Sequence, residues 1–162
     1  MDFATLYEED IETWAEIQVA ALRRLAAIPG PWSNVIDWEN VIEEIDDLSS
    51  DRKAAESLLR NAFAHLLKAA ADPDSLAVRR WRVDTSDFLD QARVKLKNSM
   101  RQRLDLDRVW MDARDAATNS LKEYDRALPP DIPRSCPFSF DDIRALDPDV
   151  DLTALLLRRR RP

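Results

Sequence analysis

A small set of polar residues falls on helix faces that are otherwise apolar, and their types can carry chemistry. Asp10, Glu44 and His65 offer two carboxylates and an imidazole, the groups that helical proteins use to hold a divalent metal or to transfer protons. Such a set predicts a metal-dependent hydrolase with a nucleotide or phosphate substrate. Gln18 and Arg114 share the inward orientation and are candidate binding residues.

The same residues have a second interpretation, which needs no catalysis. A buried carboxylate requires a partner, and the guanidinium of Arg114 can form two parallel bonds with Asp10 or Glu44. Gln18 and His65 would then satisfy neighbouring polar groups. We favour this buried ion-pair network, because the chain has neither an HExxH motif nor a pair of ExxH motifs. The sequence therefore predicts no cofactor, with a divalent metal ion as the alternative.

Helical ExxE and ExxD pairs, which hold magnesium in nucleotide pyrophosphohydrolases, offer a related hypothesis. Glu9 with Glu12, and Glu43 with Asp46, have this spacing. On a helical wheel, however, Glu12, Glu43 and Asp46 point away from the apolar faces. These carboxylates are predicted to face water, which argues against such a site.

Helices must position these side chains, because the composition favours helix nearly everywhere. The chain of 162 residues has one glycine, is rich in Ala, Leu, Glu and Arg, and contains no strand-like alternation. We expect an all-α fold, a single up-and-down antiparallel bundle of about five helices with a proline-rich C-terminal extension. A chain of this length can bury a core without disulfide bonds.

The first helix is predicted from a cap and from apolar periodicity. Thr5, with a glutamate three residues later, forms a capping box, and the periodicity continues without a break to Ile28. Its apolar face includes Tyr7, Trp14 and Leu25. The proline and glycine residues that follow Ile28 end the helix.

Residues 37–71 are predicted to form a helical hairpin. Asp37 caps its first helix, and a second helix is expected to start near Ser49 or Ser50. Folded in this way, the hairpin would bring an acidic flank against His65.

The remaining helices are expected at residues 76–97 and 106–128, with a turn or kink near Asn98, where the periodicity slips. Ser139 is suited to cap one more short helix. A proline-rich connection precedes it and is predicted to lie on the bundle.

A single domain is expected, followed by a tail. The domain comprises residues 1–146 and includes the proline-rich connection 128–138. Residues 147–162 form the predicted tail, and the arginine run 158–161 near its end is expected to be disordered.

Charge is unevenly distributed along the chain. Residues 1–51 hold thirteen acidic residues against Arg23 and Arg24, whereas residues 78–103 hold eight basic residues against three aspartates. Acidic and basic helices are therefore expected to be neighbours or to present solvated faces. The net charge of −7 argues against strong nucleic-acid binding, which depends on phosphate neutralisation.

Localisation is predicted from what the sequence lacks. No run approaches the roughly 20 apolar residues that span a bilayer, and the acidic start has none of the features of a signal peptide. The single cysteine, Cys136, can form no internal disulfide. We expect a cytoplasmic protein with no membrane association.

Several segments together resemble a known family. They are LYEEDIETWAEIQVAALRR, DWENVIEEIDDL, LRNAFAHLLKAA, the pair Trp81 and Arg82, and a Cys-Pro-Phe that begins at Cys136. In this order they resemble the bacterial family named domain of unknown function 29, over nearly the whole chain. The resemblance implies a helical bundle and implies no activity. Its motif positions include Asp10, Gln18, Glu44, His65 and Arg114.

The favoured function is an interaction or regulatory module rather than an enzyme. A homodimer or another protein is the expected partner. Trp32 lies in the loop after the first helix, so it is the predicted surface anchor for that partner. Four other tryptophans fall on apolar faces and are predicted to lie in the core.

Overall fold

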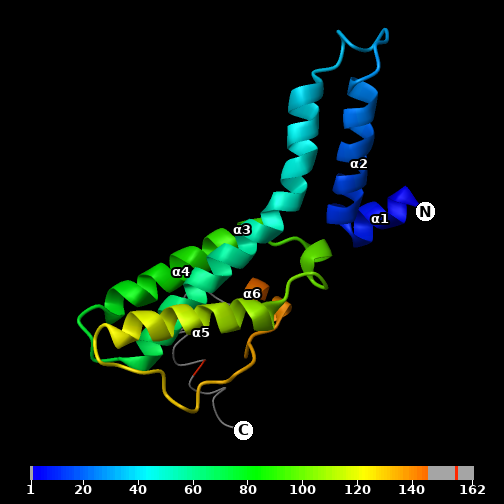
Figure 1. The fold of residues 1–162 in the computed structure, drawn as a ribbon. Helices are drawn as coiled ribbons and strands as arrows, with labels where there is room; N and C mark the ends of the chain where they lie inside the picture. Colours follow the sequence, from blue (N-terminus) through cyan, green and yellow to red (C-terminus); the bar gives the residue numbers. More distant parts are fainter. Residues whose placement is uncertain (1, 146–155, 157–162) are drawn as a thin grey trace. The chain divides into compact units, whose positions relative to one another are not determined.

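The computed structural model describes residues 2–145 and residue 156, and most of these residues are helical (Figure 1). No strand occurs in this part of the chain, so the all-α prediction is confirmed. Seven helical segments occur there, against about five predicted. They are α1 (Phe3–Glu9), α2 (Ile11–Ala26), α3 (Trp38–Ala71), α4 (Val78–Lys95), the 3-10 helix η1 (Asn98–Met100), α5 (Leu106–Lys122) and α6 (Phe140–Ala145).

The chain divides into two compact units. Unit 1 comprises Met1–Lys53 and Lys97–Arg103, and unit 2 comprises Ala54–Leu96 and Leu104–Pro162. Helix α3 contributes its first half to unit 1 and its second half to unit 2. The predicted boundary between residues 146 and 147 lies outside the described residues, as does nearly all of the predicted tail, so that division stays a prediction.

The predicted first helix is broken at Asp10, which separates α1 from α2. The backbone of Asp10 is not helical, with φ −146° and ψ 71°. Its N–H closes α1 on the carbonyl of Leu6, and its carboxylate accepts the N–H of Thr13 at 3.1 Å to cap α2. Asp10 is a strong cap residue, and capping on both sides outweighs the continuous periodicity. The break also changes which residues of α2 face inward.

Helix α3 is one helix of 34 residues, so the predicted hairpin over residues 37–71 is wrong. Asp37 does cap its start, since its carboxylate accepts the N–H of Asn40. Ser50, however, does not begin a second helix. Its hydroxyl donates to the carbonyl of Asp47 at 2.9 Å, a bond that serine makes inside helices. No proline or glycine lies between Asp37 and Pro73, so nothing forces the chain to turn.

A helical hairpin does form in unit 1, between other partners. Figure 1 shows α2 running antiparallel beside the first half of α3, with the loop of residues 27–37 between them. We call α2, this loop and residues 38–53 the N-terminal hairpin. Gly30 lies in the loop with a negative φ, so this position does not need glycine for its backbone conformation. It needs a residue without a side chain, because a Cβ there would lie 2.5 Å from the indole of Trp32.

Unit 2 holds the large aromatic core. Trp110 of α5 is fully buried and meets Phe63 of α3 edge-on, with ring centroids 5.3 Å apart. Phe138 stacks on Phe63 at 5.8 Å, which packs the proline-rich connection onto the core as predicted. Helix α4 joins the core through Thr85, whose buried hydroxyl reaches the carbonyl of Ala62 in α3 at 3.4 Å and also donates to the carbonyl of Trp81 in its own helix at 2.8 Å. Trp110 alone among the four predicted core tryptophans is buried, and the other three are half-buried.

Two local predictions in the second half of the chain are confirmed. The predicted kink near Asn98 is η1, and Ser139 caps α6, accepting the N–H of Asp142 at 3.0 Å while its own N–H donates to the Asp142 carboxylate at 2.8 Å. Helix α4 begins at Val78, two residues after the start expected at residue 76, and Asp72 before it pairs with Arg126 at 3.3 Å.

Proline at position 50 tests the continuity of α3. Ser50→Pro removes an internal helical N–H and clashes with the preceding turn, so we expect a loss of about 3 kcal/mol in unfolding free energy. Ser50→Ala keeps the backbone and should change stability by less than about 0.5 kcal/mol. Urea denaturation followed by circular dichroism measures both. If Ser50 began a separate helix, proline would be accommodated there and the two variants would be equally stable.

Candidate functional site

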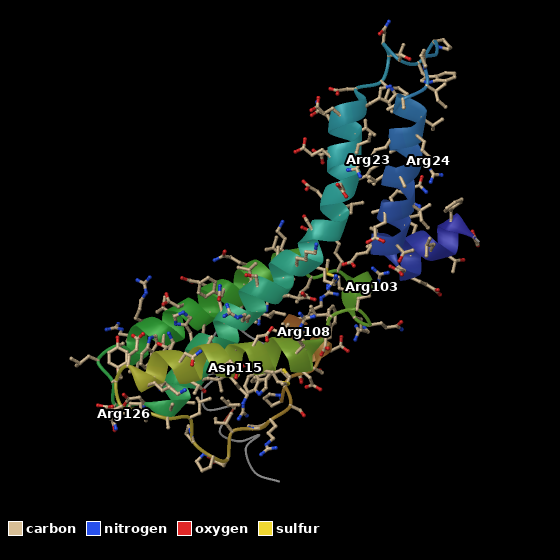
Figure 2. All side chains as sticks on the ribbon, in the orientation of Figure 1. Arg23, Arg24, Arg103, Arg108, Asp115 and Arg126 are labelled. Carbon is tan, nitrogen blue, oxygen red and sulfur yellow. The ribbon has the colours of Figure 1, made fainter. Side chains whose placement is uncertain are left out.

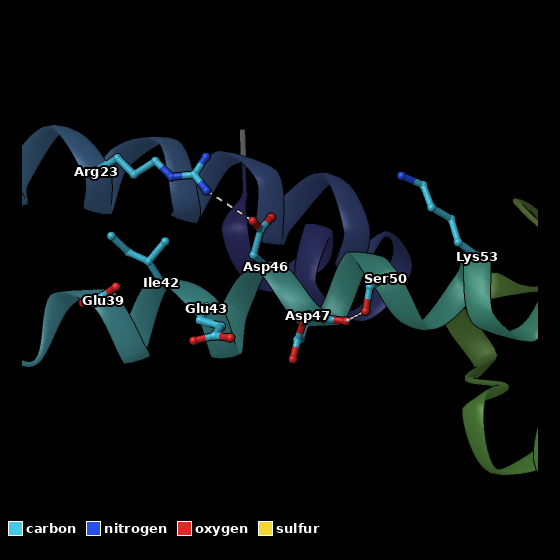
Figure 3. A pocket seen from close by; sticks show the side chains of 8 residues that line it. All are labelled: Arg23, Glu39, Ile42, Glu43, Asp46, Asp47, Ser50 and Lys53. Carbon is cyan, nitrogen blue, oxygen red and sulfur yellow. Dashed lines mark hydrogen bonds and ion pairs between the residues drawn. The ribbon is translucent and has the colours of Figure 1, made fainter.

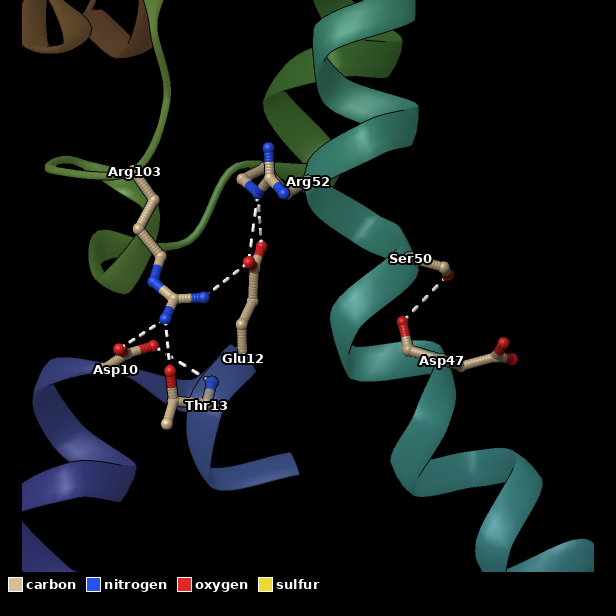
Figure 4. A network of polar contacts seen from close by, with 7 residues as sticks. All are labelled: Asp10, Glu12, Thr13, Asp47, Ser50, Arg52 and Arg103. Atoms are coloured by element: carbon tan, nitrogen blue, oxygen red, sulfur yellow. Dashed lines mark hydrogen bonds and ion pairs between the residues drawn. The ribbon is translucent and has the colours of Figure 1, made fainter. Parts of the chain in front are cut away.

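A buried carboxylate organises the polar groups of unit 1. Glu12 of α2 is only 4% exposed. Arg52 of α3 approaches it with Nε 2.8 Å from Oε1 and 3.0 Å from Oε2, and Arg103 donates to Oε2 at 2.6 Å. Figure 4 shows both guanidinium groups turned toward this one side chain. Glu12 was predicted to face water, and that prediction is wrong, because the break at Asp10 turns its side of α2 inward.

Arg103 extends this network to the start of α2. Its guanidinium contacts the carboxylate of Asp10 at 2.5 Å and the hydroxyl of Thr13 (Figure 4). Nearby in sequence, Lys97 pairs with Asp51 at 2.7 Å. Lys97 and Arg103, at the end of the basic segment, are thus bound to the acidic N-terminal segment, which is one of the two arrangements expected for the acidic and basic parts of the chain.

The charges in this network stabilise one another. Burial by itself raises the pKa of the Asp10 carboxyl, but the hydrogen bonds from Thr13 and Arg103 outweigh burial and leave the pKa below its usual value. For Arg103, burial lowers the pKa, while the bonds to Glu12 and Asp10 raise it above its usual value. Two carboxylates face two guanidinium groups, so the network is balanced in charge. This arrangement locks segments together and leaves no carboxylate oxygen directed at a metal.

The three predicted metal or catalytic candidates are placed in different surroundings. Asp10 lies in the network with Arg103. Glu44 is exposed on the first half of α3, in unit 1. His65 lies in unit 2, on the second half of α3. Among the described residues, no group of three His, Cys, Asp or Glu side chains is arranged to hold a metal ion.

The three predicted binding residues also differ in their roles. Arg114 was predicted to pair with Asp10 or Glu44, but its guanidinium donates to the backbone carbonyls of Ile132, at 3.0 Å, and Pro133. It anchors the proline-rich connection, and Arg103 takes the role that Arg114 was given. Gln18 is half-buried on α2, between its buried and exposed sides. Trp32 is 40% exposed in the loop of the N-terminal hairpin.

His65 stands in a second polar cluster, between α3 and α4. Its Nδ1 is buried without a hydrogen-bond partner among the described residues and lies 3.7 Å from Oδ2 of Asp84. Asp84 also pairs with Arg80 at 2.8 Å. Lys68 lies one turn from His65, with its ammonium 5.3 Å from the ring centre of Trp81. Among the described residues, the cluster thus offers an imidazole beside a carboxylate, with a lysine one turn away.

Burial governs the protonation of this cluster. Desolvation, together with the positive charge of Lys68, lowers the pKa of His65, and Asp84 only partly opposes the shift. Desolvation also lowers the pKa of Lys68, again opposed by Asp84. Both groups therefore lose their protons more readily than in water. The enclosed cavity nearby, lined by residues that include Ala62, is apolar and about 10 Å³, too small for a substrate.

The N-terminal hairpin carries an open groove of about 610 Å³ on one side. Figure 3 shows its rim, where Arg23 of α2 reaches Asp46 of α3 at 3.2 Å. Four carboxylates line it, from Glu39, Glu43, Asp46 and Asp47. All four are exposed, so water can solvate them, and nothing converges there in the manner of a catalytic site.

Comparison with known proteins agrees with the architecture. The family described as Domain of unknown function DUF29 matches residues 6–149. The chain belongs to this family. Among solved structures, this DUF29 protein is similar to an alpha-helical protein of unknown function from Rhodospirillum rubrum, with 26% identity and a TM-score of 0.69 over 94% of this chain and 96% of the other. None of the curated proteins matches it.

The resemblance noted in the sequence is therefore confirmed. Membership of this family does not assign an activity to the chain, because the family is described as a domain of unknown function. In the described part of this DUF29 protein, no helix is long and apolar enough to cross a membrane.

Sequence reasoning missed three members of the unit 1 network, which are Glu12, Arg52 and Arg103. One signal for Glu12 was present, because Asp is a preferred N-cap residue, so Asp10 can begin a new helix and break the apolar pattern. No local signal marks Arg52 or Arg103. Their separations from Glu12 are 40 and 91 residues, so only the tertiary structure selects them among the other arginines.

Neutralising Glu12 tests the network. Glu12→Gln keeps the shape of the side chain but leaves two guanidinium groups facing an uncharged amide. Because Arg52 and Arg103 are each partly exposed, we expect a loss of about 2 kcal/mol rather than the larger cost of a fully buried orphan charge. Chemical denaturation measures it. Glu16→Gln, on the exposed side of the same helix, is the matched control, and equal losses in the two variants would contradict the assigned role.

His65 is expected to make the stability of the folded protein depend on pH. It is the only histidine in the chain, and its pKa is lowered on folding, so the unfolded chain takes up a proton near pH 6.5 before the folded protein does. Stability should fall as the pH drops from about 7 toward 5, and His65→Gln should lose less over this interval. Urea midpoints at three pH values measure the difference. Parallel curves for the two proteins would show that His65 is not desolvated.

Proposed function

We propose that this DUF29 protein is a cytoplasmic interaction module, without catalysis or a cofactor, that binds another protein through the N-terminal hairpin. The observation that carries the proposal is an apolar surface left exposed there. Of thirteen large apolar side chains exposed among the described residues, six lie between positions 25 and 41: Leu25, Ile28, Trp32, Val35, Ile36 and Val41. Monomeric proteins seldom concentrate exposed apolar side chains in this way without a use for them.

Helix α2 is apolar over too wide an arc for its one long neighbour. Residues placed at about 100° intervals put Ala15, Val19 and Leu22 on one stripe, which packs against α3. Trp14, Ala21 and Leu25 form a second stripe, about 105° away around the helix. A helix that packs on one partner needs an apolar arc of only about 100° or a little more. The second stripe therefore needs a cover of its own.

Helix α1 covers only one end of this second stripe. Tyr7 meets Trp14 edge-on, with ring centroids 4.9 Å apart. Farther along, Leu25 is 45% exposed and Ile28 is 53% exposed. On α3, Val41 is placed about 140° around the helix from Asp46, whose ion pair with Arg23 marks the opposite side of the hairpin, and Val41 is 38% exposed. We call Ala21, Leu25, Ile28 and Val41 the apolar face.

The polar clusters support an interaction module better than an enzyme. In unit 1 the buried charges pair with one another, and in unit 2 the Nδ1 of His65 lies 3.7 Å from Asp84 without a hydrogen-bond partner among the described residues. A catalytic base must reach the proton that it removes in a bound substrate. The cavity of about 10 Å³ between α3 and α4 is too small to hold a substrate.

Site-specific photo-crosslinking in bacterial cells tests the proposal. A benzophenone amino acid at position 25, in the apolar face, should give a covalent protein adduct visible as a shifted band on a denaturing gel. The same amino acid at position 43, an exposed site that lines the acidic groove, is the matched control and should give little or no adduct. No adduct at position 25, or equal adducts at both positions, would refute an interaction through the apolar face.

A further inference from the structure

We infer that the partner of the apolar face is a second copy of this chain, so that two N-terminal hairpins pack face to face as four helices. The inference rests on the proposed function, because it names the occupant of the same surface. Three features support it: the chemistry of the face, the charges at its two edges, and the area that two hairpins can cover.

The apolar face is suited to burial against an identical surface. Its residues Leu25, Ile28 and Val41 are between 38% and 53% exposed, and none carries a polar atom in its side chain. A surface of this kind matches a copy of itself, since apolar side chains need only complementary shape. Two antiparallel helices with one uncovered apolar side are also half of a four-helix bundle.

The two edges of the apolar face carry opposite charges. Arg24 borders it on α2, one turn from Ala21 and Ile28, and Glu44 borders it on α3, one turn from Val41. Figure 2 shows Arg23 and Arg24 leaving α2 on different sides. Arg23 reaches Asp46, so residues 23–24 of α2 lie level with residues 44–46 of α3. Within the described chain, neither Arg24 nor Glu44 is bonded to an oppositely charged side chain.

These edge charges select one symmetric arrangement. Two hairpins can stack face to face with the two-fold axis either along the helices or across them. An axis across the helices places α2 on α2 and brings the two Arg24 side chains together, which is repulsive. An axis along the helices places α2 of one copy against α3 of the other at the same level. Arg24 then faces Glu44 of the second copy on both sides of the dimer.

The area available fits a weak but specific dimer. Helix α2 has 16 residues and is therefore about 24 Å long, and two helices side by side are about 20 Å wide. Because α1 covers one end of it, the resulting face is at most about 500 Å² per copy, below the ~800 Å² of a standard interface. The exposed loop, with Trp32 and Val35, can enlarge it at the end of the hairpin. We therefore expect dissociation in the micromolar range.

Charge exchange across the dimer tests the inference on the full chain. Sedimentation equilibrium of the purified protein should show a monomer–dimer equilibrium. Arg24→Glu and Glu44→Arg should each weaken dimerisation by tenfold or more, because each places two like-charged pairs at the interface. The double variant, with both changes, should recover dimerisation to within about threefold of the original protein. Circular dichroism confirms that each variant keeps its helices.

A neighbouring residue supplies the matched control. Glu43→Arg makes the same change of charge one position away, on the acidic groove side of the hairpin, and should leave the dimer unchanged. A monomer at all concentrations would overturn the inference, as would equal effects of Glu43→Arg and Glu44→Arg or a double variant that stays monomeric.

The crosslinking experiment separates this inference from the proposed function. An adduct at position 25 with twice the mass of the chain supports the second copy. An adduct with a different protein, together with a monomer in sedimentation, would contradict the inference that the partner is a second copy. The same result would support the proposed function as an interaction module. No adduct at position 25 overturns the proposed function itself.

Discussion

One buried charge sets the arrangement of unit 1. Glu12 is 4% exposed, and a carboxylate in that position destabilises the fold unless cations neutralise it. Its two partners come from α3 and from the segment that contains η1, which are 40 and 91 residues away in the chain. Satisfying this one side chain therefore fixes three segments against one another. We infer that this network selects one register of the helices, because the cost of desolvating its charges offsets much of their attraction.

Unit 1 depends on this network because it has little apolar core. Fully buried apolar side chains there come from Ala15, Val19 and Met100, whereas unit 2 buries Trp110 within a cluster of aromatic rings. Unit 2 is stabilised by the packing of its apolar side chains. Arg114 holds the proline-rich connection by donating hydrogen bonds to the backbone carbonyls of Ile132 and Pro133. Unit 1 retains an apolar face that its own segments do not cover. This contrast places the proposed interaction surface in unit 1.

Sequence reasoning succeeded where a local interaction decides the structure. The caps at Asp37 and Ser139 form between residues three apart, and the kink near Asn98 follows from a slip in local periodicity. It failed where one local signal had to be weighed against another. The apolar pattern runs without interruption through Asp10, so one unbroken helix was predicted there. On that helix Glu12 was predicted to face water. Ser50 resembled a helix start, but its hydroxyl bonds within α3.

By itself, the sequence determined the helical class and the family, because composition and motif order are properties of the chain alone. Tertiary structure decided which carboxylate is buried, why Arg103 rather than Arg114 holds Asp10, and which apolar side of α2 stays uncovered. Periodicity shows that a helix has an apolar side, but not which segment will pack on it. That choice depends on where breaks such as Asp10 turn the helices, and on partners far away in the chain.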